Sequence, residues 1–211
     1  MNRLRLTIAS LLFASVAATG CVTSATAGST RAPVTQQAID RAALRAKLAE
    51  RRDLTIERFL AYREARVYPI NDLRGSGMRH QWIDAQGHLC AAATLLSLDW
   101  GREATLLAGK KDNGIKLANV TKGPIADWIL TSGLTHHEIV AIQVPGSDMF
   151  PAPQESDRMY QIYVDVERQL SGLRNEALDE ATDALMKRPE LAREVLDGKV
   201  AGPGPYAVPV A

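Results

Sequence analysis

The spacing of apolar and polar residues predicts a protein built from α-helices. Between residues 35 and 67 the less polar side chains recur three or four positions apart, as they do on one face of an amphipathic helix. This stripe comprises Ile39, Ala42, Ala46, Ala49, Ile56, Leu60 and Val67. Asp53 interrupts it and is able to cap a second segment, so one kinked helix and two abutting helices both fit the pattern. Pro69 ends the segment because it disfavours helical geometry at the residue before it.

A second long stripe lies in the last third of the chain, with steps of three and four almost throughout. Its members are Met159, Tyr163, Val166, Leu170, Leu173, Ala177, Ala181 and Ala184. Gly172 is expected to kink this helix, at a cost of about 1 kcal/mol relative to alanine. A last helix begins at Pro189 and ends near Asp197. We expect the two long helices to pair across the outside of the core.

Residues 78–145 predict a compact module of short helices, over 88–98, 102–111 and two further segments. Pro124 lies in the first turn of one of these and Gly133 just past its end, which is the asymmetry that helices prefer. Thr135 and Glu138 have the spacing of a capping box at the start of the next. The predicted fold class is therefore all-α, with this module flanked by two long amphipathic helices. The single helical domain spans 35–198, and the Pro/Gly-rich tail 199–211 is expected to be disordered.

Residues 1–20 have the parts of an export signal: two arginines, an apolar run over 6–18 and then small residues. The run is shorter than the roughly 20 residues that cross a bilayer. The junction "AATGC" resembles the bacterial lipobox, in which a cysteine is acylated and becomes the first residue, here Cys21. Val22 in the next position implies the outer membrane. Cleavage after Ala27 is the alternative, and would give a secreted or periplasmic soluble protein without Cys21.

Composition narrows the possible partners. Lys and Arg number 25 against 24 Asp and Glu, so no global positive field draws the protein to nucleic acid. Residues 21–34 are small, polar and Pro-containing, as in a flexible tether. Cys21 is either acylated or removed, which leaves Cys90 without a partner in its own chain, so we expect no intramolecular disulfide.

Cys90 is the candidate catalytic residue. It lies in the first turn of a predicted helix, where the helix dipole stabilises a thiolate, and His136 or His137 would be the base. Asp84 or Asp148 would orient that base. We favour the alternative in which Cys90 is a small core residue, because free cysteines are among the most buried residues and three alanines follow this one.

We expect no metal and no cofactor. The candidate ligands have no zinc-site spacing, and the adjacent histidines of a helix point to different sides. These candidates are His80, His88, Cys90, His136 and His137.

The stretches "WIDAQGHLCAAATLL" and "GLTHHEIVAIQ", with an asparagine and a tryptophan between them, resemble a module that recurs in secreted bacterial proteins of unknown function. The matching residues are Asp84, Gly87, Cys90, Ala91, Asn113, Trp128, Gly133, Leu134, Thr135, Glu138, Ile142 and Gln143. The chain departs from the module's pattern at 92–93 and 144–145. The resemblance covers about a third of the chain and implies no activity, but it places Cys90 inside a module.

Together these features predict an exported, lipid-anchored envelope protein with an interaction or scaffolding role and no catalysis. Its partners would be the membrane, through the N-terminal lipid, and a protein, through the long helices. Nucleic acid is not expected as a partner. The alternative function is a thiol-dependent hydrolase or acyltransferase of the envelope that uses Cys90 on peptide or amide bonds.

Overall fold

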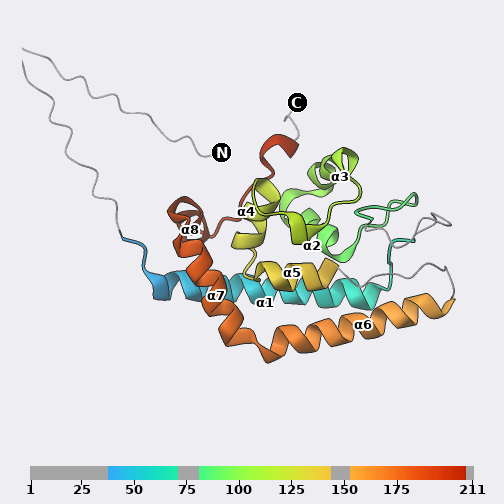
Figure 1. Cartoon of the computed structure of the whole chain (residues 1–211), viewed down its shortest axis with the longest axis horizontal. Coiled ribbons are helices and arrows are strands. Elements are labelled where there is room, and N and C mark those ends of the chain that lie inside the picture. The colour runs from blue at the N-terminus through green and yellow to red at the C-terminus, as the bar shows by residue number, and fades with distance from the viewer. Residues whose placement is uncertain (1–37, 71–80, 144–152, 208–211) are drawn as a thin grey trace, which may run out of the picture. The chain divides into compact units, whose positions relative to one another are not determined.

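The computed structural model describes residues 38–70, 81–143 and 153–207, and within them the predicted all-α fold is confirmed (Figure 1). The long helices are α1 (Arg41–Ala65) and α6 (Pro153–Gly172). The shorter ones are α2 (Ala91–Trp100), α3 (Arg102–Lys111), α4 (Pro124–Thr131), α5 (His136–Gln143), α7 (Arg174–Met186) and α8 (Pro189–Leu196). Two 3₁₀ turns, η1 (Leu117–Asn119) and η2 (Gly204–Tyr206), complete the set. Among these helices none is long and apolar enough to cross a membrane.

Helix α1 is one continuous helix of 25 residues, so Asp53 does not divide it. Its N-cap is Asp40, whose carboxylate accepts hydrogen bonds from the N–H groups of Ala42 and Ala43. It ends at Arg66, which adopts a left-handed conformation with φ 53°, before Pro69 is reached. The two alternatives that the sequence left open are thus resolved in favour of a single helix.

The predicted stripe on α1 lies at the edge of the buried face, where Ile39, Ala49, Ile56 and Leu60 are partly buried and pack against the core. The helix buries Leu44, Leu48, Arg52, Thr55, Phe59 and Tyr62, which are also spaced three or four apart. Ala42, Ala46 and Val67 of the predicted stripe are exposed instead, Val67 at 49 %. The fully buried Arg52 lies in the middle of this face and pairs with a carboxylate on a distant helix, and a hydropathy pattern does not contain that pairing.

Helices α6 and α7 replace the single long helix expected near the C-terminus. The break is sharper than a kink at Gly172, because Leu173 leaves helical geometry with φ −116° and ψ 25°. Leu173 is 60 % exposed, against the prediction that it belongs to the buried stripe. The stripe is buried on both sides of the break, at Met159, Tyr163, Val166, Leu170, Ala177 and Ala181.

The expected pairing of the long segments is confirmed, since α1 packs against both α6 and α7. In Figure 1 helix α6 runs alongside α1, and α7 crosses it. Helix α1 also contacts α2, so it lies between α6 and the module of short helices. One apolar cluster joins that module to α1 and α6 around the fully buried Trp128 and Phe59. A second joins the first half of α1 to α7 and α8.

The segment after α8 differs from the disordered tail that composition predicted. Residues 199–207 lie against the domain, with Ala201 only 4 % exposed, because side chains of distant helices bind its backbone. Several features predicted from the sequence lie outside the described residues: the export signal 1–20, Cys21 and the tether 21–34, together with His80 and Asp148.

Candidate functional site

Cys90 is the N-cap residue of α2, one position before the helix begins. Its sulfur accepts a hydrogen bond from the N–H of Ala93 at 3.5 Å, and the residue is 9 % exposed. Burial raises the pKa of the thiol to about 11, and the hydrogen bonds from the N–H groups of Ala93 and Ala92 only partly offset it. The helix starts later than the predicted residue 88 because Leu89 forms an isolated β-bridge with Ile83.

The histidines that would serve Cys90 have other partners. His136 Nε2 lies 2.8 Å from the carbonyl oxygen of Leu117, to which it donates, and His137 is exposed on α5. His88 donates from Nδ1 to the carboxylate of Asp84 at 2.9 Å. Within the described part of the chain no hydrogen bond joins Cys90 Sγ to an imidazole, so the expected thiol and base are not brought together there.

Asp84 binds groups in and near its own turn and does not bind a histidine of α5. Its buried carboxylate accepts from the N–H groups of Ile70 at 2.9 Å, Gln86 at 2.9 Å and His88 at 2.8 Å, besides the ring of His88. Burial alone would raise the pKa of Asp84, but these N–H groups hold it below its usual value. Gly87, with φ 88°, supplies the left-handed conformation that closes the turn.

Two amides of the module hold the loops between the short helices. Asn113 accepts from the N–H of Ile83 and donates to its carbonyl oxygen, both at 2.9 Å. Gln143, at the end of α5, accepts from the N–H of Leu117 and donates to the carbonyl of Ile115, both at 2.7 Å. Both side chains therefore satisfy backbone groups that a helix or sheet would otherwise satisfy.

The predicted capping box at the start of α5 is confirmed. Glu138 accepts from the N–H of Thr135 at 2.9 Å, and the Thr135 hydroxyl accepts from the N–H of Glu138 at 3.2 Å. The same carboxylate binds the guanidinium of Arg52 at 2.8 and 2.5 Å, and Arg52 also donates to the carbonyl of Leu170 at 2.8 Å. Gly133 lets this turn approach α1, because a Cβ there would lie 2.4 Å from the backbone nitrogen of Arg52.

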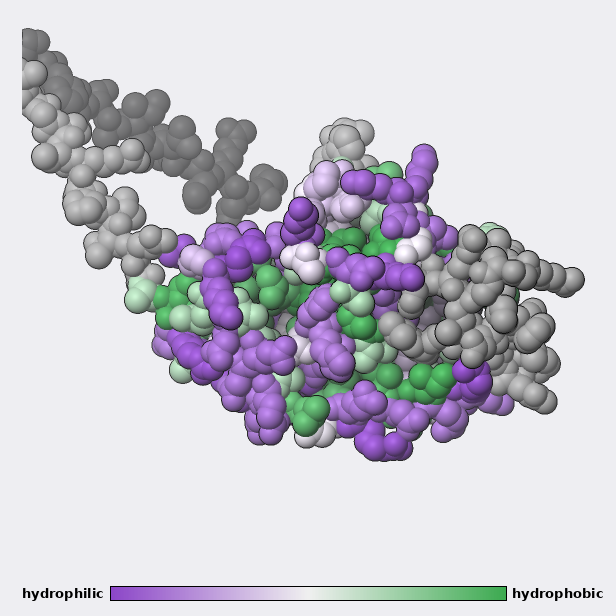
Figure 2. Space-filling view, viewed as in Figure 1, coloured by the Kyte–Doolittle hydropathy of each residue, from purple (hydrophilic) through white to green (hydrophobic). Residues whose placement is uncertain are grey.

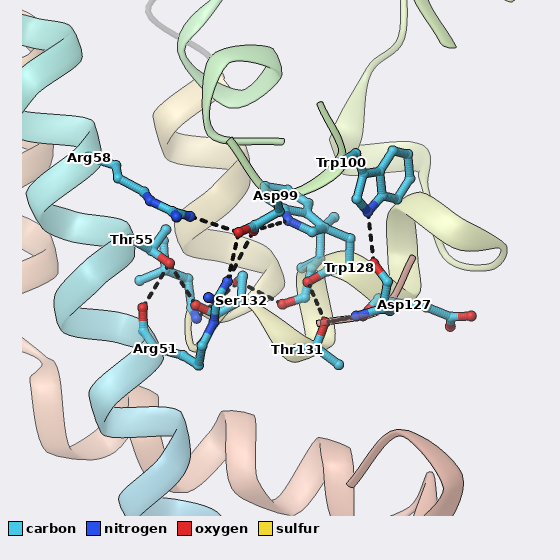
Figure 3. Close-up of polar contacts among 12 residues, drawn as sticks. Arg51, Thr55, Arg58, Asp99, Trp100, Asp127, Trp128, Thr131 and Ser132 are labelled. Carbon is cyan, nitrogen blue, oxygen red and sulfur yellow. Dashed lines mark hydrogen bonds and ion pairs between the residues drawn. The ribbon is translucent and has the colours of Figure 1, made fainter. Parts of the chain in front are cut away.

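A third buried carboxylate, which the sequence did not single out, is Asp99 near the end of α2 (Figure 3). It accepts from Arg51 at 3.0 Å, from Arg58 at 2.7 Å and from the indole N–H of Trp128 at 2.8 Å. Arg51 and Arg58 are seven residues apart, two turns along one face of α1, which is the sequence signal that could have found them. Asp99 thus joins α2 and α4 to α1 and fixes the tryptophan of the module.

The chemistry-bearing residues of the module therefore hold the backbone and the helices together. No group of three or more His, Cys, Asp or Glu that could hold a metal ion occurs in the described ranges.

An open groove of about 380 Å³ lies outside the module, between α1 and the break after α6. It is lined by Asp53, Ile56, Glu57, Leu60, Leu170, Ser171 and Arg174, none of which was a candidate. On the face shown in Figure 2, apolar residues form patches separated by hydrophilic ones.

Comparison with known proteins adds no assignment. No family model matches the chain, and neither a curated protein nor a solved structure matches it. The resemblance of residues 82–143 to the module of secreted bacterial proteins therefore stays a prediction.

Proposed function

We propose that the chain is an exported, lipid-anchored protein of the bacterial envelope whose helical domain is an interaction or scaffolding module without catalysis. One observation carries the absence of catalysis: apart from His137, which is exposed on α5, the described candidate side chains already bind other groups of the protein or are buried. Asp84, Asn113 and Gln143 each bind main-chain groups, and the thiol of Cys90 caps a helix with its pKa raised to about 11. A thiol of that kind is protonated near neutral pH and is a poor nucleophile.

The N-terminal sequence supports the envelope location. Its apolar run over 6–18 ends within "AATGC", with two residues between it and the cysteine, and acylation of Cys21 would leave a mature chain anchored by lipid. Residues 22–34 would then connect the lipid to the domain with a reach of roughly 20 Å. A domain on such a tether acts by proximity, since its surface meets only molecules at or near the membrane. The membrane is the proposed partner of the N-terminal lipid, and a protein is the proposed partner of the helical domain.

The second candidate function is a thiol-dependent hydrolase or acyltransferase. The position of Cys90 favours it, because the N–H of Ala93 points at the sulfur as it would at a thiolate. Against it stand the burial of the thiol and the engagement of His88 and His136 by Asp84 and Leu117. We therefore keep the scaffold function as the conclusion and treat the enzyme as the outcome that would replace it.

The test combines lipid labelling with a probe of thiol chemistry. The full chain and its Cys21→Ala variant are produced in a diderm bacterium fed an alkyne fatty acid, and the envelope is fractionated. We expect label and outer-membrane location for the wild type and neither for the variant. Cleavage after Ala27, read from the mass of the mature protein, would contradict the lipid anchor. Covalent capture of Cys90 by an electrophilic peptide under native conditions would contradict the absence of catalysis.

A further inference from the structure

Residues 199–207 cross the surface of the domain as an irregular segment that side chains of other helices bind. The N–H of Ala201 donates to the hydroxyl of Thr131 at 3.0 Å, and its carbonyl accepts from the indole N–H of Trp100 at 2.7 Å. Figure 3 shows Trp100 and Thr131 on neighbouring parts of the fold. Both main-chain groups of one residue are thus bound by side chains 101 and 70 positions away. Side chains of two different helices therefore hold the backbone of the segment at Ala201.

The side chains of the segment contribute two further points of contact. Ala201 is buried in the apolar cluster that contains Ala192 and Val195 of α8. Tyr206 stacks on Trp100, with ring centroids 6.1 Å apart and planes inclined by 25°, and the ammonium of Lys111 lies 5.8 Å from the tyrosine ring centroid. A small residue in a closed pocket and an aromatic ring on an indole are the features that give a peptide site its sequence preference.

A third contact, at Gly204, restricts which residues can lie between Ala201 and Tyr206. Gly204 has φ 51° and passes so close to α4 that a Cβ there would lie 2.9 Å from Pro124 Cγ. The segment between Ala201 and Tyr206 reads "AGPGPY", in which two prolines limit the conformations of the free chain. The two glycines of the segment lose more conformational freedom than other residues when they are held, so the prolines offset only part of the entropy cost of binding.

We propose that the surface formed by Trp100, Lys111, Pro124 and Thr131 is a peptide-binding site for segments of the type Ala-Gly-Pro-Gly-Pro-Tyr, bound with a 3₁₀ turn at their last three residues. The chain's own residues 199–207 occupy it in cis, and the same segment of a second copy occupies it in trans when the first is displaced. Exchange of these segments links copies of the protein on one membrane. The inference deepens the proposed scaffolding function and rests on it for this role, whereas the binding site itself is testable on the purified chain.

The physical basis of exchange is the small number of contacts that close the site. Two hydrogen bonds from Ala201, one buried methyl group and one ring stack hold the segment, and the core helices do not depend on it for their own hydrogen bonds. The chain's own segment competes with an external peptide for the site. Because this segment is attached directly after α8, its effective concentration at the site is high. An external peptide therefore binds the closed chain far more weakly than a chain whose segment has been released.

The experiment uses the full chain and a fluorescein-labelled peptide with the sequence of residues 198–207. Ala201→Asp releases the segment, because the carboxylate does not enter the apolar pocket, and leaves Trp100 and Thr131 intact. We expect saturable binding of the peptide to this variant by fluorescence anisotropy, and at least roughly 10-fold weaker binding to the wild type. The same peptide carrying Asp in place of Ala201 should not bind.

Tyr206→Ala provides a second release variant if Ala201→Asp does not fold, as judged by circular dichroism. Tyr160→Ala is its matched control, since it removes a partly buried tyrosine on α6 and leaves the segment closed. Peptide binding that appears with Tyr206→Ala but not with Tyr160→Ala supports the site. Absence of binding to every folded release variant, or loss of the fold in both, would overturn the proposal. Lipid labelling of Cys21 tests the proposed function, and its result does not depend on whether the peptide binds.

Discussion

Removal of the negative charge of Glu138 is the change that best tests how the domain is held together. Glu138→Gln retains an amide oxygen that accepts from the N–H of Thr135, so the capping box survives. What is lost is the charge that neutralises Arg52, whose side chain is 0 % exposed. The substitution therefore separates the ion pair from the helix cap.

The expected cost follows from the burial of this pair. Breaking a buried ion pair by removal of one partner costs about 3–5 kcal/mol, because an uncompensated charge remains inside the protein. Arg52 keeps its hydrogen bond to the carbonyl of Leu170, which places Glu138→Gln near the lower end, at about 3 kcal/mol. For a domain of this size that loss lowers the melting temperature by roughly 6–12 °C.

Urea unfolding followed by circular dichroism measures the loss, with Asp53→Asn as the matched control. Asp53 also pairs with an arginine, Arg174, but their side chains are 59 % and 42 % exposed. Exposed pairs contribute at most about 1 kcal/mol, so the control should lose less than that. If Glu138→Gln costs no more than Asp53→Asn, the Arg52 pair does not hold α5 on α1 and the reasoning fails.

Three further sets of substitutions test other contacts. Gly133→Ala should lower the free energy of unfolding in urea by at least about 2 kcal/mol, because a Cβ there meets the backbone of α1. Gly172→Ala is the control and should be neutral or slightly stabilising, since there is open space around Gly172. Equal effects of the two substitutions would contradict the close approach of Gly133 to α1. Asp84 has a folded-state pKa below its unfolded one, so the stability it contributes is complete above about pH 4 and is lost as the pH falls through the folded-state pKa. Asp84→Asn should therefore remove part of the acid-induced loss of stability, and parallel pH profiles would contradict this. Cys90→Ala should lose about 1 kcal/mol of helix capping and Cys90→Ser less, and a larger loss for serine would contradict the capping role.

The sequence predicted best the features that depend on neighbouring residues. The capping box of Thr135 and Glu138 and the positions of Pro124 and Gly133 at the two ends of α4 are local, and the structure contains all of them. The burial of Arg52 on α1 could not be predicted, because it depends on a carboxylate 86 residues away. Hydropathy assigns an arginine to the surface unless its partner is known.

The partners of the candidate residues could not be predicted for a related reason. Asp84 was one of two aspartates expected to orient a histidine of α5, but its carboxylate accepts hydrogen bonds from the N–H groups of Ile70, Gln86 and His88 and from the ring of His88. The segment after α8 has the composition of a disordered tail, and contacts from the rest of the fold order it, among them the hydrogen bonds of Trp100 and Thr131 and the stacking of Tyr206 on Trp100. Composition predicts that such a segment cannot fold alone, but it does not predict the contacts that the rest of the protein makes with it.

Alkylation of Cys90 tests the central claim most directly. In a Cys21→Ala chain Cys90 is the single thiol, and intact-mass spectrometry counts its modification by iodoacetamide near neutral pH. Because the thiol is buried and its pKa is raised to about 11, we predict no modification of the native protein and complete modification once denaturant unfolds it. Rapid modification of the folded protein would show an accessible, ionised sulfur and would contradict the account.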